Sequence, residues 1–204
     1  MALVSLEPSE LKRLVRRRRG TGADRFDEVW DGVYVMAPLA DNEHQSLGLN
    51  LAIILKNALE SVEPIQIFAG CNVSDQPKRW KRNYRCPDVA VFLPGNPAED
   101  RKTDWYGGPD FAVEILSRFD RSREKFGFYK SVGVRELLLV DRHPWALELY
   151  RADGRDWAPA GRAEVTLGGS ILSEVLGLTF QLNPGVARPQ IEVVQKDTGK
   201  KWFV

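Results

Sequence analysis

The chain has 204 residues, of which 43% are hydrophobic and 28% are charged. These proportions are typical of a folded domain and exclude a disordered, collagen-like or coiled-coil chain. The 29 lysines and arginines against 28 aspartates and glutamates leave a formal charge of +1, so a polyanionic partner would have to bind a local basic patch. No apolar run reaches the roughly 20 residues that cross a bilayer. Two cysteines without a signal peptide favour a reducing compartment. We therefore expect a cytoplasmic protein with one main domain and no membrane partner.

A basic helix is predicted over residues 8–19, because Leu11, Leu14 and Val15 recur at helical spacing among lysines and arginines. The pair Asp31-Gly32 between two alternating segments is the strongest local signal of a tight hairpin. Later segments have either the period of an amphipathic helix or the apolar pattern of strands. After the first helix we expect, in chain order, a hairpin over 26–36, a helix over 42–60, strands over 65–69, 89–93 and 111–116, a helix over 120–132, a strand over 136–140 and a hairpin over 146–159.

This order of strands and helices predicts a mixed α/β fold. We place a basic N-terminal helix in residues 1–25, the main domain in 26–184 and a C-terminal tail in 185–204. No clear periodicity follows Pro184. The tail, which ends in Lys200, Lys201, Trp202 and Phe203, either contributes to a dimer or has no fixed structure.

Two carboxylates stand in segments that are expected to be buried. Asp88 follows Pro87 at the start of one predicted strand, and Glu114 lies inside the apolar run Phe-Ala-Val-Glu-Ile-Leu-Ser. An ionised carboxylate among apolar neighbours is unfavourable unless a cation, a metal ion or several donors meet it. If the two strands pair, both carboxylates can face one side of the sheet and offer the hard oxygen ligands that suit Mg²⁺ or Mn²⁺. The alternative is structural: Glu114 pairs with a buried Arg or Lys, and Asp88 caps a strand or turn.

The ordered set of motifs resembles that of the Uma-type restriction endonucleases, a bacterial family of the PD-(D/E)XK nuclease superfamily. Pro87-Asp88-Val89 is similar to the family's PD motif, and Val113-Glu114-Ile115-Leu116-Ser117 is similar to its second acidic motif. The resemblance spans about residues 26–150 and implies a restriction-endonuclease-like fold, with a mixed central β-sheet flanked by helices. The other matching positions are Asp31-Gly32, His44, Asp120, Lys125, Tyr129, Gly133-Val134-Arg135-Glu136 and Leu139-Val140-Asp141.

The resemblance implies a metal-dependent endonuclease that hydrolyses phosphodiester bonds of DNA. Asp88, Glu114 and the backbone carbonyl of Ile115 would hold Mg²⁺ or Mn²⁺, which would act as a Lewis acid and lower the pKa of a bound water. The superfamily pattern places a Lys two residues after the Glu, where this chain has Leu116. Members of the family recruit the Lys from the following helix, where Lys125 is the matching residue. It would stabilise the pentavalent phosphate or orient water.

Three residues are candidates for auxiliary roles near the metal, and each has a structural alternative. They are His44, the neighbouring Glu43, and Asp120. Hydrogen bonding at the start of a helix would explain His44, and helix capping would explain Asp120. A solvated Lys125 paired with Asp120 or Glu124 is the corresponding alternative for the lysine. We expect Tyr129 in the core.

A basic stretch immediately before Asp88 is the candidate nucleic-acid contact. Phosphate-binding cations interleaved with aromatic rings are typical of such contacts. The expected residues are Lys78, Arg79, Trp80, Lys81, Arg82 and Arg85. The arginines of the first helix form a further basic patch, for which a solvated surface is the simpler interpretation.

Together these features predict a metal-dependent DNA endonuclease, and we expect a homodimer because a nuclease must cut two strands. The alternative is a non-catalytic nucleic-acid-binding or interaction module on a nuclease fold, since Leu116 replaces the usual Lys. A hydrolase of another phosphate ester is a third possibility, because carboxylates and a metal do not choose the leaving group. The joint presence of Asp88, Glu114 and Lys125 favours the endonuclease.

Overall fold

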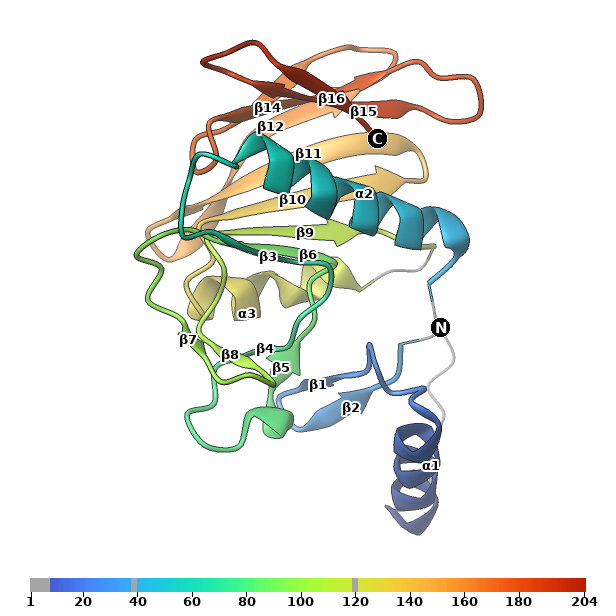
Figure 1. The fold of residues 1–204 in the computed structure, drawn as a ribbon. Coiled ribbons are helices and arrows are strands. Elements are labelled where there is room, and N and C mark those ends of the chain that lie inside the picture. The colour runs from blue at the N-terminus through green and yellow to red at the C-terminus, as the bar shows by residue number, and fades with distance from the viewer. Residues whose placement is uncertain (1–7, 38–39, 119–120) are drawn as a thin grey trace.

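The apolar runs that predicted buried strands form the middle of a six-stranded sheet (Figure 1). In spatial order its strands are β12 (Asp156–Glu164), β11 (Trp145–Asp153), β10 (Glu136–Arg142), β9 (Phe111–Ile115), β6 (Val89–Phe92) and β3 (Gln66–Phe68). The computed structural model describes residues 8–37, 40–118 and 121–204. Strand β9 pairs in parallel with β10 and antiparallel with β6, so the central sheet is mixed, as the sequence predicts.

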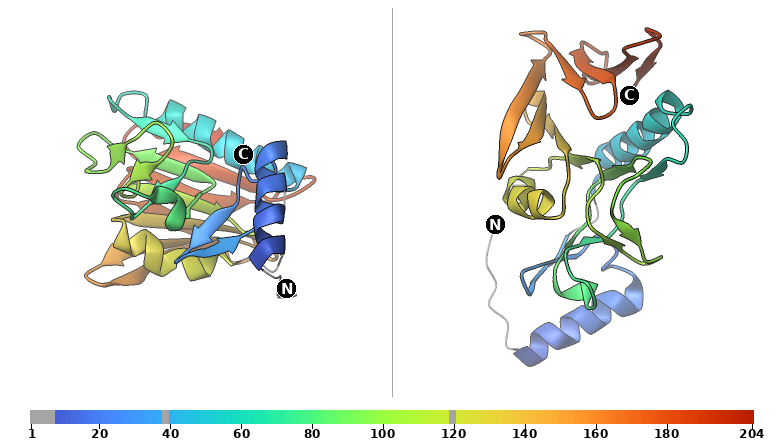
Figure 2. Two further views of the ribbon diagram at one scale, coloured as in Figure 1. Left: turned by 90° about the horizontal axis from the view of Figure 1, so that it is seen from below. Right: turned by 90° about the vertical axis from the view of Figure 1, so that its left-hand side faces the viewer.

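One face of the central sheet is covered by helix α2 (Asn42–Ala58), which crosses β3, β6 and β9. Its Leu47, Leu51 and Leu55 recur at helical spacing and are fully buried against Val89 and Val113. Helix α3 (Phe126–Ser131) lies on the other face, as the right-hand view of Figure 2 shows. Because both faces are covered, every residue of β9 is buried.

The side chains of β9 alternate between these two faces, as they do in any strand. Val113 packs on the α2 side, whereas Ala112 packs on the α3 side with Phe128 and Tyr129. Glu114 therefore points to the α3 side, into the layer between the central sheet and the N-terminal hairpin. The layered arrangement thus decides which elements can meet the buried carboxylate.

A second sheet on the α3 side consists of short strands around the predicted hairpin. Its strands, in spatial order, are β2 (Val33–Val35), β1 (Glu28–Trp30), β5 (Tyr84–Arg85), β4 (Val73–Ser74), β8 (Trp105–Tyr106) and β7 (Glu99–Asp100). The hairpin turn is formed by Asp31 and Gly32 at φ 49° and 86°, the positive values that a tight two-residue turn requires. β4, β5, β7 and β8 are too short to produce a sequence period, so the sequence did not predict them.

A third sheet closes the C-terminal end of the molecule. It contains β13 (Ser170–Ser173), β14 (Leu178–Asn183), β15 (Gln190–Gln195) and β16 (Lys201–Phe203) in that order. β15 and β16 lie in residues 185–204, where the sequence analysis expected a tail. Ile191 and Val193 are fully buried, and Phe180 stacks on Phe111 of the central sheet at 5.9 Å. This segment therefore belongs to the folded core on the α2 face.

Helix α1 (Pro8–Thr21) lies at the opposite end of the molecule from the C-terminal sheet (Figure 2). It corresponds to the predicted basic helix, and Arg18 attaches it to the hairpin through Asp27 at 2.5 and 2.6 Å. The predicted 120–132 helix is instead the 3₁₀ helix η2 (Ser122–Lys125) followed by α3, and Asp120 lies outside the described residues. A further 3₁₀ helix, η1 (Trp80–Arg82), interrupts the basic stretch. Within the described residues no helix is long and apolar enough to span a membrane.

Candidate active site

Asp88 and Glu114 meet because β6 and β9 are antiparallel neighbours. Val89 pairs with Val113, and the same register places Asp88, which immediately precedes β6, opposite Glu114. The Asp88 carboxylate accepts a hydrogen bond from the backbone N–H of Ile115 at 2.7 Å through Oδ2, and its Oδ1 lies 2.8 Å from Nε2 of His44. The pairing of β6 with β9, which the metal-site prediction needed, is therefore present. His44 contacts one of the two carboxylates, Asp88.

Glu114 is almost completely enclosed, with 2% of its surface exposed. The ammonium of Lys125 donates to both of its oxygens at 2.9 and 3.0 Å. Ser122 donates to Oε2 at 3.0 Å, and Tyr129 donates to Oε1. The helical segment after β9 thus brings Lys125 to the carboxylate from eleven positions along the chain. This is the buried cation that the structural alternative required and also the lysine that the family resemblance implied.

Burial and the neighbouring charges both shift the pKa values of Glu114 and Lys125. Desolvation raises the pKa of Glu114 to about 7, the nearby carboxylates of Asp88 and Glu28 add to the rise, and Lys125 opposes it. Burial lowers the pKa of Lys125, but the facing carboxylates of Glu114, Glu28 and Asp88 outweigh burial and raise it above its ordinary value. Lys125 therefore remains an ammonium ion among three carboxylates.

Glu28 is the functional candidate that the sequence analysis missed. Its Oε1 lies 3.0 Å from Nζ of Lys125 and accepts the backbone N–H of Cys86 at 2.7 Å, and its Oε2 accepts from the indole of Trp30. Only 5% of Glu28 is exposed. Alternation along the hairpin strand could have indicated an inward carboxylate, but Asp27 and Glu28 are adjacent, so the pattern alone does not choose between them.

The start of α2 is fixed by a buried arginine that the sequence analysis also missed. Arg142, 4% exposed, donates to Asp41 at 3.0 Å and to Glu43 at 2.8 Å, and lies 3.4 Å from Oγ of Ser117. Asp41 caps α2 by accepting the backbone N–H of His44 at 2.8 Å. Glu43, one of the predicted auxiliary residues, thus faces Arg142. The arginine orients the helix turn that carries His44.

The hydrogen bond to Asp88 and its negative charge determine the protonation of His44. Burial lowers the pKa of the imidazole, but the contact with Asp88 outweighs burial and raises it above its ordinary value. The Nδ1 atom lies 3.4 Å from Oγ of Ser117. His44 is therefore held between the carboxylate and the segment that follows β9.

We expect Asp41→Asn to destabilise the protein at neutral pH but not in strong acid. Hydrogen bonding from Arg142 lowers the pKa of Asp41 from 3.8 to about 2. A depressed carboxyl pKa stabilises the fold above the unfolded value and loses this effect as pH falls through the folded value. Because Asp41 is mostly exposed, we expect a difference of no more than about 1 kcal/mol. Urea unfolding at several pH values measures it, and an equal difference at pH 7 and pH 2 would contradict this assignment.

The predicted nucleic-acid residues divide into two groups. Lys78, Arg79, Lys81 and Arg82 are exposed, with the ammonium of Lys81 5.3 Å from the ring of Trp80. Arg85 is only 3% exposed, so its prediction as a surface contact does not agree with the structure. Pairing of β5 turns this side chain inward, where its guanidinium lies 4.9 Å from Trp30 and 4.3 Å from Phe128. It also donates to the carbonyl of Val29 at 2.8 Å, which indicates a structural role.

The donor chemistry of the cluster fits a hard divalent cation, although the structure does not form a ready-made metal site. No group of three or more His, Cys, Asp or Glu side chains in the described ranges is arranged to hold a metal ion. Asp88 and Glu114 nevertheless supply carboxylate oxygens from adjacent strands, the ligand type that Mg²⁺ and Mn²⁺ prefer. Glu28 provides Lys125 with a second carboxylate, so release of an oxygen of Glu114 would not leave the ammonium unpaired.

Comparisons with known proteins bear on the family and the fold of the chain. A comparison with curated proteins found no match. Among solved structures, the chain is similar to a crystal structure described as "a putative nuclease belonging to DUF820" from Anabaena variabilis ATCC 29413. The TM-score is 0.52 at 15% sequence identity, over 65% of this chain and 75% of that chain, which supports a restriction-endonuclease-like fold. Residues 15–185 match the Uma2 family, described as "Putative restriction endonuclease". As this match covers most of the sequence and the motif residues meet in one cluster, the chain belongs to the Uma2 family.

Proposed function

We propose that this protein is a metal-dependent endonuclease that hydrolyses phosphodiester bonds of DNA. The observation that carries the proposal is the convergence of Asp88, Glu114 and Lys125 from two paired strands and the following helical segment. Two carboxylates and a lysine can together hold a divalent cation and stabilise the negative charge of a phosphate. Membership of a family described as restriction endonucleases supports the same activity.

Asp88, Glu114 and the backbone carbonyl of Ile115 would hold the Mg²⁺ or Mn²⁺ ion. When bound, the ion supplies positive charge that stabilises the charge developing on the phosphate. Lys125 contributes a fixed ammonium beside the same carboxylates, and Glu28 keeps it oriented toward them. His44 holds a proton at its Nε2 atom next to Asp88 and so fixes the orientation of that carboxylate. Arg142 supports His44 through Asp41 and Ser117.

The exposed part of the basic stretch is the proposed DNA contact. Lys78, Arg79, Lys81 and Arg82 supply charge for phosphates, and Trp80 offers an aromatic surface for a base or sugar. Arg85 is left out of this contact because it is buried. We also propose a homodimer, in which two copies act on the two strands of a duplex. Sedimentation of the purified protein tests the dimer, and a monomer at all concentrations would contradict it.

One observation favours the alternative of a non-catalytic module on the nuclease fold. Both oxygens of Glu114 already accept hydrogen bonds from the protein, from Lys125, Ser122 and Tyr129. A carboxylate satisfied in this way can be retained for structure alone. Binding of a metal ion distinguishes the two candidates, because a purely structural carboxylate has no need of one.

Calorimetric titration with Mn²⁺ tests the metal site without requiring a substrate. We expect Asp88→Ala and Glu114→Gln each to weaken Mn²⁺ binding by about tenfold or more, since each removes an anionic ligand. Glu124→Gln, an exposed carboxylate of η2 that pairs with Arg121, is the matched control and should bind like the parent protein. Circular dichroism checks that each variant is folded. Unchanged Mn²⁺ binding by both site variants would place the metal elsewhere and favour the non-catalytic module.

A further inference from the structure

Helix α1 and the η1 segment each carry exposed cations that have no carboxylate partner. The chain as a whole is nearly neutral, yet α1 carries six lysines and arginines against one glutamate. Arg18 is bound to Asp27, and Arg19 lies 3.9 Å from Asp24. The structure shows no ion pair, within the ranges it describes, for Lys12, Arg13, Arg16, Arg17, Lys78, Arg79, Lys81 or Arg82. Like charges gathered without partners repel one another, so the fold itself does not explain them.

These two basic segments, about sixty residues apart in sequence, both contribute cations to the lining of one groove. It has a volume of about 570 Å³ and is lined by Arg19 of α1, by Lys81 and Arg82 of η1, and by residues of the β1–β2 hairpin. Asp31 and Asp75 also line it. The carboxylate of Asp75 accepts hydrogen bonds from the amides of Asn83 and Gln76, both at 2.9 Å.

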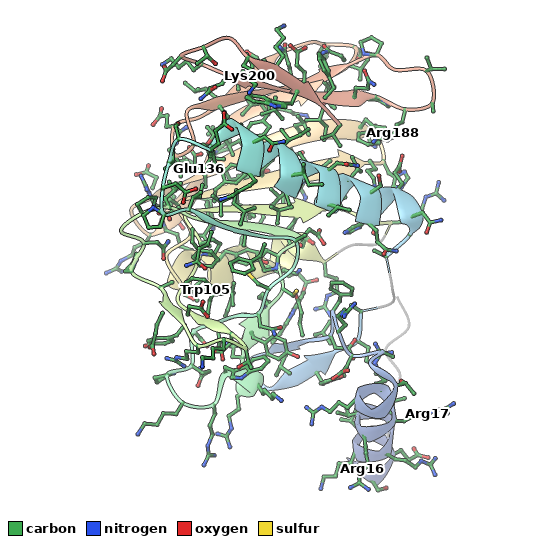
Figure 3. The ribbon with its side chains drawn as sticks, in the orientation of Figure 1. Arg16, Arg17, Trp105, Glu136, Arg188 and Lys200 are labelled. Carbon is green, nitrogen blue, oxygen red and sulfur yellow. The ribbon has the colours of Figure 1, made fainter. Side chains whose placement is uncertain are left out.

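The line of positive charge continues beyond the groove along α1. A second hollow of about 420 Å³ on this helix is lined by Lys12, Arg16 and Arg19, together with Leu11 and Val15. The three cations are spaced so that they share one face of the helix. They extend over about 10 Å at 1.5 Å per residue. Arg19 belongs to both hollows, and Figure 3 shows Arg16 on the helix where it stands apart from the sheets. A continuous track of this length fits repeated phosphates better than a single anion.

This track is separate from the carboxylate cluster. Neighbouring side chains of β1 leave the strand on opposite sides, so Val29 lines the groove while Glu28 reaches Lys125. A ligand in the groove therefore touches the same hairpin as the cluster without touching its carboxylates. Removing positive charge from the groove should therefore weaken binding of the ligand while leaving the carboxylates and the lysine of the cluster in place.

We infer that α1 and η1 form an accessory groove that binds the phosphate backbone of duplex DNA outside the active site. This inference rests on the proposed function only in taking DNA as the polyanion. The Uma2 match begins at residue 15, so the first turns of α1, including Lys12, lie outside the matched region. The groove would hold the duplex against the hairpin that also supplies Glu28.

Fluorescence anisotropy with a short labelled duplex, in EDTA and over a range of KCl concentrations, tests the groove. Two double variants remove charge from its two basic segments: Arg16→Ala with Arg19→Ala, and Lys81→Ala with Arg82→Ala. Alanine retains helical propensity, so α1 should remain folded. Arg155→Ala with Lys196→Ala is the matched control, because both residues are exposed and unpaired in the described chain and lie far along the sequence from either basic segment. Each groove variant should bind more weakly and reduce the slope of log K against log salt by about 0.9 per lost phosphate contact.

The outcomes separate this inference from the proposed hydrolysis, since binding in EDTA does not depend on cleavage. Weaker binding and a smaller slope in both groove variants, with the control unchanged, support the groove even if the parent protein cleaves nothing. A slope equal to that of the parent in the α1 variant overturns it, even if cleavage is observed. Binding to anionic lipid vesicles is measured with the same proteins. If the α1 variant loses vesicle binding that the parent protein shows, while its DNA binding is unchanged, the inference is also overturned, because α1 would then be a membrane-surface helix.

Discussion

Substitution of Lys125 by Met is expected to lower the free energy of unfolding by about 3–5 kcal/mol, the cost typical of leaving buried charge without its partner. Methionine matches the length of lysine but carries no charge. The ammonium of Lys125 lies 2.9–3.0 Å from the carboxylates of Glu114 and Glu28, which are 2% and 5% exposed. Its removal leaves two buried acidic groups facing each other. Urea unfolding in EDTA measures the effect without any contribution from bound metal.

Two further variants show whether charge compensation is the cause. Lys130→Met changes a lysine of α3 whose ammonium lies 5.7 Å from the ring of Trp157, and it should cost no more than about 1 kcal/mol. Adding Glu28→Gln and Glu114→Gln to Lys125→Met should restore much of the lost stability, because the two buried carboxylates that Lys125 neutralises are then uncharged as well. If Lys125→Met is as stable as Lys130→Met, Lys125 does not compensate these carboxylates.

Glu114→Gln and Asp88→Asn are each expected to reduce the single-turnover rate of DNA cleavage by at least about 10²–10³-fold, the loss typical of removing one preorganised electrostatic group. Both substitutions keep the shape of the side chain but remove a negative charge that would hold the cation. Their affinity for duplex DNA should be unchanged, since neither residue lies in the basic groove. Rapid-quench cleavage and anisotropy on the same preparations measure the two quantities separately.

Glu124→Gln is the control for this pair of variants, because Glu124 is an exposed carboxylate that pairs with Arg121. It should cleave like the parent protein. A Glu114→Gln variant that cleaves at the parent rate would exclude this carboxylate from the reaction and assign it to structure, together with Lys125, Ser122 and Tyr129.

The parts of the fold that the sequence predicted are those with a strong local signal. Continuous apolar runs predicted β6, β9 and β10, and the helical period predicted α2. The pair Asp31-Gly32 predicted the hairpin turn. Asp88 and Glu114 were recognisable because carboxylates are rare in buried strands. Their meeting could be predicted from pairing of two adjacent apolar strands.

Residues that act through tertiary contacts had no comparable signal. Glu28 and Arg142 reach the cluster only because the hairpin and β10 pack beside it, and nothing local distinguishes them from surface charges. Arg85 belonged to a basic run in the sequence, but a two-residue strand turned it into the interior. The strands β15 and β16 were missed because Pro184, Gly185 and Pro189 obscured the alternation before them.

Cleavage of supercoiled plasmid tests the central claim most directly. The purified protein and its Glu114→Gln variant would be incubated with plasmid in Mg²⁺, in Mn²⁺ and in EDTA. A metal-dependent nuclease site at Glu114 predicts nicked and linear products from the parent protein with either metal, and none with EDTA or from the variant. If the parent protein yields no product under any condition while still binding DNA, the hydrolytic function is contradicted and the nuclease fold serves as a binding module.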